Sequence, residues 1–175
     1  MIIIGVLTFS GLVLTFADIV IELAEGLLVL TILLIALASL VLGMGVPVTA
    51  AYLITAVVAV PALIHLVVNE IAAHMIVYWL SQDSNITPPV CIAAFAGATI
   101  AKANMWRTAI SSFMFAKFLY LAPFIFGFFP GFTLQGDLWD IVKVFVLVLV
   151  ATWGYSWVLS GIWISPLKNL FSASR

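Results

Sequence analysis

The stretch GLLVLTILLIALASLVLGMGVPVTAAYLITAVVAVPALIH, residues 26–65, decides the fold of this chain. It contains no Asp, Glu, Lys or Arg. A helix that crosses about 30 Å of hydrocarbon needs roughly 20 residues, so this stretch is too long for a single crossing. Gly43, Gly45 and Pro47 interrupt it near the middle. We therefore expect two apolar helices joined by an irregular turn, in a chain that lies in a membrane.

The composition of the whole chain also indicates a membrane protein. Of its 175 residues, 66% are hydrophobic and 7% are charged, whereas a soluble domain has roughly 25% charged residues. The net charge of -1 gives no reason to expect nucleic acid binding. The single cysteine, Cys91, has no partner for a disulfide,. The first residues lack the basic region of a cleavable signal peptide. We expect an all-α integral membrane protein.

The remaining apolar runs extend this pattern over residues 1–175 as a single membrane domain. Thr87-Pro88-Pro89 interrupts a second long run, as Gly43 to Pro47 interrupts the first. The expected segments are a span over 2–24, a re-entrant hairpin over 26–65, a broken span over 71–101, spans over 108–129 and 141–165, and a cytoplasmic tail over 166–175.

The basic residues predict the orientation, because cytoplasmic loops carry an excess of Lys and Arg. Lys102 and Arg107 share one loop, and Lys168 and Arg175 share the tail. Two spans between these regions return the chain to the same face, so both are expected in the cytoplasm. The acidic segments over 18–25, at 70 and over 137–140 then lie on the outer face.

Two interpretations of residues 26–65 remain open. The segment either crosses the membrane twice or turns back at membrane depth. A turn exposed at the interface usually carries Lys, Arg or aromatic anchors, and residues 42–51 have none. We favour the re-entrant hairpin, with two spanning helices and a short Gly-Pro turn as the alternative.

The interruption at residues 84–89 predicts a cation site. Pro88 and Pro89 have no N–H, so the carbonyls of Ser84 and Asn85 lose their usual helical donors. The side-chain oxygens of Ser84, Asn85 and Thr87 lie around them, with Asp83 adjacent. Irregular backbone at membrane depth is tolerated only where protein packs on it or water reaches it. Such a group of neutral oxygens suits sodium.

The hairpin tip predicts the complementary anion site. Gly43 and Gly45 allow close backbone approach, and Pro47 can begin the returning helix in its first turn. The N-terminus of that helix favours an anion. The predicted sodium ligands are Gly43, Gly45, Thr49, Ser84, Asn85 and Thr87, and the predicted substrate contacts are Val46, Pro47, Val48, Pro88 and Pro89.

Several other ionisable residues are candidates for pairing. Lys117 lies deep in an apolar segment, and an intramembrane lysine is a functional hypothesis by default; we consider a charge relay or ion pair with Asp83, or a structural pairing. Glu70 and His74 share a helix face, and a structural pair is favoured over a metal site. No phosphate loop, nucleophile elbow or Cys/His cluster occurs, so no enzyme activity is expected.

Three runs of residues resemble a known family: LGMGVPVTAAY at 42–52, ITPPV at 86–90 and AAFAGA at 93–98. Together with AAH at 72–74 and FAKFLYLAPF at 115–124, they resemble the large membrane subunit of the tripartite ATP-independent periplasmic (TRAP) transporters. The similarity is greatest to the fused permeases of the TAXI branch, and it extends over about residues 2–129.

This resemblance implies a function as well as a fold. It implies sodium-driven import of organic acids, received from an extracytoplasmic solute-binding protein and moved by an elevator-type displacement in a bacterial or archaeal cytoplasmic membrane. Sodium ions would serve as coupling ions, and no cofactor is expected. In that family each repeat of an ion-transporter-like fold contributes one re-entrant hairpin and one broken helix. The chain contains one of each, so we expect it to be the second repeat, partnered by a first repeat or a small membrane subunit and by membrane lipid.

Two other functions remain open on the residues alone. Asp83 and His74 could titrate in a proton-coupled anion exchanger, which would work without sodium. The chain could also be a structural membrane subunit without a transport site. An intramembrane enzyme using Asp83 is disfavoured, because a second catalytic Asp is lacking nearby.

Overall fold

A computed structural model describes residues 6, 9–43, 46–83, 85–88 and 90–172. All regular elements in these residues are helical, as predicted. They are α2 (Leu12–Leu23), α3 (Leu28–Leu42), α4 (Val48–His65), α5 (Glu70–Asp83), α6 (Ile92–Ile100), α7 (Met105–Phe115), the 3-10 helix η1 (Ala116–Leu121), α8 (Ala122–Phe128), the 3-10 helix η2 (Pro130–Thr133) and α9 (Leu138–Ser172).

Length and composition identify the helices that can cross a membrane. Val48–His65 and Leu138–Trp157 are each long and apolar enough, and a third crossing is possible if the bent pair α7 and α8 counts as one span. The chain is therefore a helical membrane protein. The interruption predicted at Gly43 to Pro47 falls between α3 and α4, and the one predicted at Thr87 to Pro89 falls between α5 and α6.

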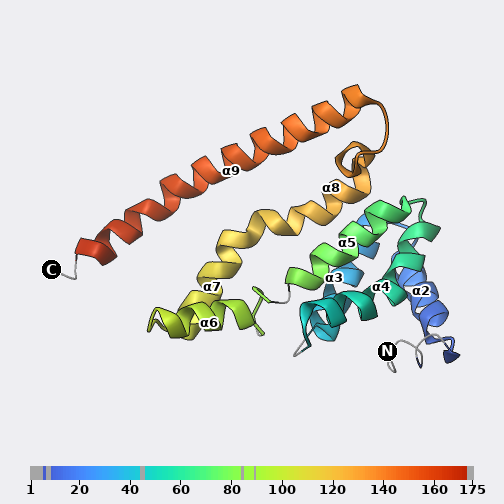
Figure 1. Ribbon diagram of the computed structural model, residues 1–175, viewed down its shortest axis with the longest axis horizontal. Coiled ribbons are helices and arrows are strands. Elements are labelled where there is room, and N and C mark those ends of the chain that lie inside the picture. The colour runs from blue at the N-terminus through green and yellow to red at the C-terminus, as the bar shows by residue number, and fades with distance from the viewer. Residues whose placement is uncertain (1–5, 7–8, 44–45, 84, 89, 173–175) are drawn as a thin grey trace.

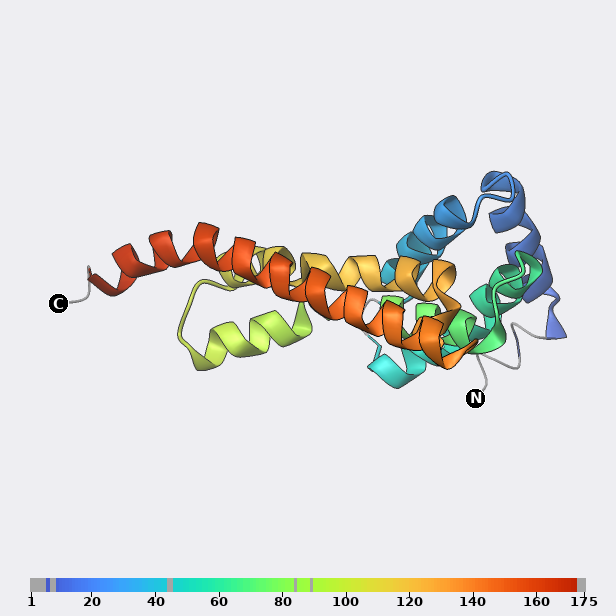
Figure 2. The same cartoon turned by 90° about the horizontal axis from the view of Figure 1, so that it is seen from above.

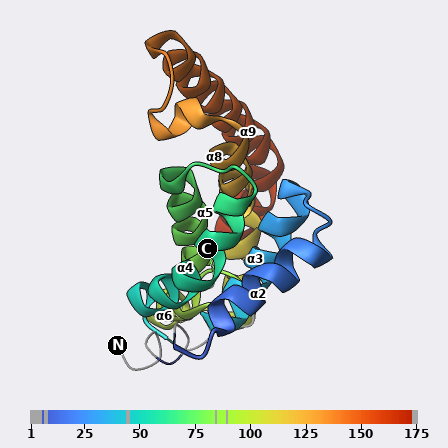
Figure 3. The same cartoon turned by 90° about the vertical axis from the view of Figure 1, so that its right-hand side faces the viewer.

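The main core lies between α2, α3, α4, α5 and α8 (Figures 1 and 3). Alanines line the contact of α4 with α5, including Ala59 and Ala73, which are 1% and 0% exposed. Small side chains allow membrane helices to approach closely, which favours their association. A second, smaller core of Cys91, Ala94 and Ala109 joins α6 to α7. The hairpin helices and α5 thus form one packed unit, and α6 with α7 extends from it.

The predicted span over 2–24 lies partly outside the described residues and stays a prediction. Among the described residues, α2 begins only after Gly11, which has a φ of 72°. Its 12 residues correspond to about 18 Å at a rise of 1.5 Å per residue, well short of the hydrocarbon thickness. The left-handed conformation of Gly11 interrupts the regular helical ladder at this point of the predicted span,.

The predicted single span over 108–129 is bent by 49°. Pro123 explains the bend. It has no N–H to offer to the carbonyl of Leu119, and its ring crowds that carbonyl. The Trp79 indole N–H on α5 donates instead to the Leu119 oxygen, at 3.0 Å. A 3-10 turn, η1, therefore joins α7 to α8 at a point held by α5.

Helix α9 lies apart from the bundle of α2 to α5 (Figure 1), and seen from above it runs away from α2 and α3 toward the C-terminus (Figure 2). None of its candidate membrane window, Leu138–Trp157, is buried by the rest of the chain. It contacts η2, where Gly131 packs against the backbone of Asp140. The helix continues to Ser172, beyond Pro166, where a tail was predicted to start. An exposed apolar helix of this length leaves room for lipid or another protein segment around it.

Candidate functional site

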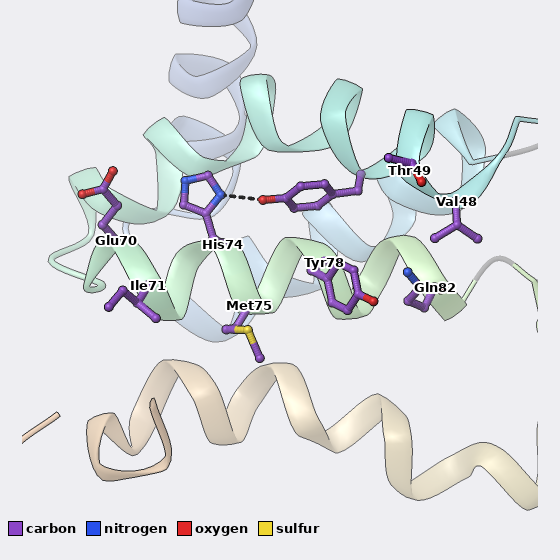
Figure 4. Close-up of a pocket in the computed structure, with 9 residues that line it drawn as sticks. Val48, Thr49, Glu70, Ile71, His74, Met75, Tyr78 and Gln82 are labelled. Atoms are coloured by element: carbon purple, nitrogen blue, oxygen red, sulfur yellow. Dashed lines mark hydrogen bonds between the residues drawn. The ribbon is translucent and has the colours of Figure 1, made fainter. Parts of the chain in front are cut away.

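The hairpin tip lies beside the end of α5. Because α4 and α5 pack antiparallel, the first turn of α4 meets the last turn of α5 (Figure 4). A groove of about 620 Å³ follows this contact, and Val48, Thr49 and Gln82 line one end of it. On α3, the Ser39 hydroxyl contacts the Leu80 carbonyl at 3.3 Å. The two interruptions singled out in the sequence are therefore neighbours in space.

The tip residues occupy the positions that the sequence suggested, with one shift. Gly43 is buried and caps the C-terminus of α3. Pro47 is the N-cap of α4 rather than its first helical residue, and no side chain among the described residues caps that end. Val48 and the exposed Thr49 form the first turn, and Val46 precedes the cap. Gly45 lies outside the described residues.

The break between α5 and α6 is more fully hydrogen-bonded than predicted. Pro89 was expected to leave the carbonyl of Asn85 without a donor, but the N–H of Ala93 donates to it at 3.2 Å. The chain can fold back in this way because Cys91 takes a positive φ of 40° before α6. Ser84 and Pro89 lie outside the described residues, and Pro88 is half-buried in the turn. The predicted free oxygen at Asn85 is therefore wrong.

Thr87 is the buried centre of the break. Its hydroxyl donates to the Asp83 carbonyl, and it lies 2.6 Å from the Tyr120 hydroxyl on η1. A threonine hydroxyl has one proton, so Tyr120 is the donor in the second bond. One lone pair on the Thr87 oxygen remains for a further partner. The break between α5 and α6 thus contacts the bend between α7 and α8, through Thr87 and Tyr120.

Sequence reasoning missed Tyr120 because it treated residues 108–129 as one regular span. Pro123 was the available signal. A proline in the middle of an apolar run predicts a kink one turn earlier, which places the kink at Leu119 and Tyr120. Trp79 was missed for the same reason, since the carbonyl that it binds is freed only by that kink.

Asp83 is the buried acid of this region. Its side chain is 4% exposed, and its Oδ2 atom has no hydrogen-bond partner within the described residues. A buried polar atom without a partner costs free energy comparable to a lost hydrogen bond or more. Lys117, the predicted partner, is exposed on η1, and in the described chain no ion pair joins it to Asp83. That pairing stays a prediction.

His74 has a partner that the sequence did not indicate. Its Nδ1 atom lies 3.0 Å from the hydroxyl of Tyr52 on α4, and no bond to Glu70 occurs in the part of the chain that the structure describes. Tyr52 could not be chosen from the sequence, because the pairing depends on the register between α4 and α5. The bond ties the returning arm of the hairpin to α5.

A comparison of the sequence with models of protein families assigns the chain to a family. The sequence model of the tripartite ATP-independent periplasmic transporter DctM component matches residues 1–136. The chain belongs to the DctM family. It is thus a membrane component of a TRAP transporter, and the family is one of transport proteins rather than enzymes. Neither a curated protein nor a solved structure matches the chain.

Proposed function

We propose that this DctM-family chain forms part of a sodium-coupled transporter that imports carboxylates. In this proposal an extracytoplasmic solute-binding protein delivers the substrate, and a small membrane subunit and a further hairpin repeat complete the complex in the cytoplasmic membrane. The observation that carries it is the meeting of the hairpin tip with the broken helix, seen in the groove and in the bond from Ser39 to Leu80.

The two ends that meet have complementary chemistry. The N-terminus of α4 presents backbone N–H groups and the positive end of a helix dipole, which favour a carboxylate. The break presents oxygens, among them the Thr87 hydroxyl with a free lone pair and the side chain of Asn85. Discontinuous helices in secondary transporters bind anions and cations in this combination. Substrate and ion would then stabilise each other by their opposite charges.

The length of α3 supports a hairpin that turns back in the membrane, whereas α4 is long enough to cross it. The 15 residues of α3 reach about 22 Å, which is less than the hydrocarbon thickness of about 30 Å. We propose that the hairpin and α5 move together as the transport unit, because they share one core. Helix α9, which stays outside that core, would belong to the static scaffold of an elevator.

Uptake assays with the complete transporter test this proposal. We expect Asn85→Ala and Thr87→Ala to raise the sodium concentration needed for half-maximal uptake by about fivefold to tenfold, since losing one ion ligand costs roughly 1 to 1.4 kcal/mol. Thr99→Ala is the matched control, because the Thr99 hydroxyl is exposed and bonds only within α6. Uptake that does not respond to a sodium gradient would contradict the proposal.

Asp83 favours a second candidate, proton coupling. Its buried Oδ2 without a partner would be stabilised by a bound proton as well as by a bound cation. The same uptake assay separates the two functions. A pH gradient that drives uptake in sodium-free buffer, and that loses its effect in Asp83→Asn, would replace sodium coupling by proton coupling.

A further inference from the structure

Polar side chains form a line along the groove between α4 and α5. Glu70, His74, Tyr78 and Gln82 follow one another at intervals of four residues on α5, and all four line the groove. Residues four apart share a helix face, and Figure 4 shows them along the same side of α5. The opposite face of α5 is buried and largely apolar, with Ala73, Ile76 and Val77 along it and the buried Asp83 at its end.

This line connects two different depths of the protein. Glu70 is the first residue of α5. The residue before it, Asn69, accepts a hydrogen bond of 2.7 Å from Gln135, which lies in the loop before α9. Gln82 lies one residue before Asp83, at the break. Twelve residues of helix correspond to about 18 Å, which is more than half the thickness of the hydrocarbon core. The groove therefore leads from a connecting loop to the two interruptions.

The groove has an amphipathic lining: Val48, Ile71 and Met75 are apolar, and hydrocarbon is a poor environment only for the polar groups between them. Burying a hydroxyl or amide in an apolar medium without a hydrogen-bond partner costs several kcal/mol. Tyr78 is 45% exposed, and Thr49 on the other wall is exposed too. Polar groups at membrane depth face either a protein interior or a water-filled cavity. The groove is wide enough for many water molecules, since one water occupies about 30 Å³.

We infer that this groove is a water-filled entry route, along which the monovalent cation and the carboxylate reach the break from the outer side. This inference rests on the proposed function, because it assumes that both ligands bind near Thr87. Tyr78, Gln82 and Thr49 would offer hydroxyl and amide groups to a passing carboxylate. The Tyr52–His74 bond would hold the hairpin arm at a fixed distance from α5 and so keep the route open.

Thiol labelling of the complete transporter tests the route. The background carries Cys91→Ala, and single cysteines replace the groove residues Thr49, Met75, Tyr78 and Gln82 in turn, which leaves the Tyr52–His74 bond intact. Ile76→Cys, in the apolar core, and Leu147→Cys, on the exposed apolar surface of α9, are matched controls. A charged, membrane-impermeant thiol reagent is added outside intact cells in sodium-free buffer without substrate. Four positions are used so that one poorly folded variant does not decide the result.

We expect the groove cysteines to react about tenfold or more faster than both controls, because the reactive thiolate forms in water and not in hydrocarbon. Rates at or below those of Leu147→Cys would show that lipid fills the groove, and rates as low as that of Ile76→Cys would show that protein covers it. Either result overturns the route. Because no sodium is present, rapid labelling together with sodium-independent uptake would retain the route and reject sodium coupling.

Discussion

Thr87 illustrates how a single residue acquires a role through contacts that are distant in the sequence. Thr87 makes two hydrogen bonds to the carbonyl of Asp83, one turn earlier. Its N–H donates at 3.0 Å and its hydroxyl donates as well, so the first part of the break keeps a helix-like turn. Tyr120 then fixes the hydroxyl from a different segment. Because both hydrogen bonds hold the Thr87 hydroxyl, it cannot rotate freely, and its remaining lone pair points in a fixed direction. Such preorganisation lowers the cost of binding an ion.

The Tyr120 hydroxyl should consequently affect ion binding without touching the ion. In Tyr120→Phe the ring remains, with its contact to Phe113 at 5.4 Å between centroids, while one hydrogen bond to Thr87 is lost. We expect the half-saturating sodium concentration to rise about fivefold, from a loss of about 1 kcal/mol, with the maximal uptake rate little changed. Uptake titrated with sodium measures both quantities.

Thr152→Val serves as the control for that variant. It also removes a hydroxyl, but one that is exposed on α9 and bonds only to the Val148 carbonyl. Equal sodium responses of the two variants would contradict a positioning role for Tyr120. A fall in the maximal rate with unchanged sodium dependence would also contradict it.

At the scale of the elements, proline and glycine explain both what the sequence predicts and what it misses. The breaks at Pro47 and Thr87 to Pro89 could be predicted because those residues cannot continue a helical ladder. The bend at Pro123 obeys the same rule. In contrast, the donor from Ala93 to Asn85 depends on the positive φ of Cys91, which cysteine rarely adopts. Contacts such as Tyr52 with His74 depend on helix register, and local patterns do not encode it.

Gly131 controls how α9 attaches to the bundle. A Cβ atom at this position would lie 3.1 Å from the carbonyl oxygen of Asp140 and 3.3 Å from its carbon. Both are backbone atoms, so they cannot move without shifting the first turn of α9. We expect Gly131→Ala to destabilise the protein by about 1–3 kcal/mol, as overpacking does, and to lower its thermal unfolding temperature in detergent.

Gly154→Ala provides the matched comparison within α9. A Cβ atom there would meet nothing within 4 Å, and alanine is favoured over glycine in a helix by about 1 kcal/mol. The unfolding temperature of this variant should stay the same or rise. If both variants unfold at the same temperature, the close contact of η2 with α9 does not contribute to stability.

On the scale of the whole molecule, the loops divide between two ends. The bond from Gln135 to Asn69, 2.7 Å long, joins the connection before α5 to the connection before α9. The loop with Lys102 lies between α6 and α7, and Arg107 is in the first turn of α7, at the other end of the interrupted helices (Figure 1). This separation agrees with the charge pattern, which could be read from the sequence because it requires no knowledge of packing. The contact between the hairpin tip and the break after α5 could not be predicted from the sequence, because it depends on how the helices pack.

Side-specific labelling tests the orientation that this division implies. Since loops rich in Lys and Arg stay in the cytoplasm, a cysteine replacing Ala103 should react with an impermeant thiol reagent only after the cells are permeabilised. A cysteine replacing Gln135 should react in intact cells, because its loop lies at the opposite end. Both variants carry Cys91→Ala, and both should react fully once the membrane is opened, which controls for local accessibility.

Reaction at residue 103 in intact cells would invert the orientation. It would also place the mouth of the groove near Glu70 on the cytoplasmic side, so that the groove would serve release of the carboxylate and not its entry.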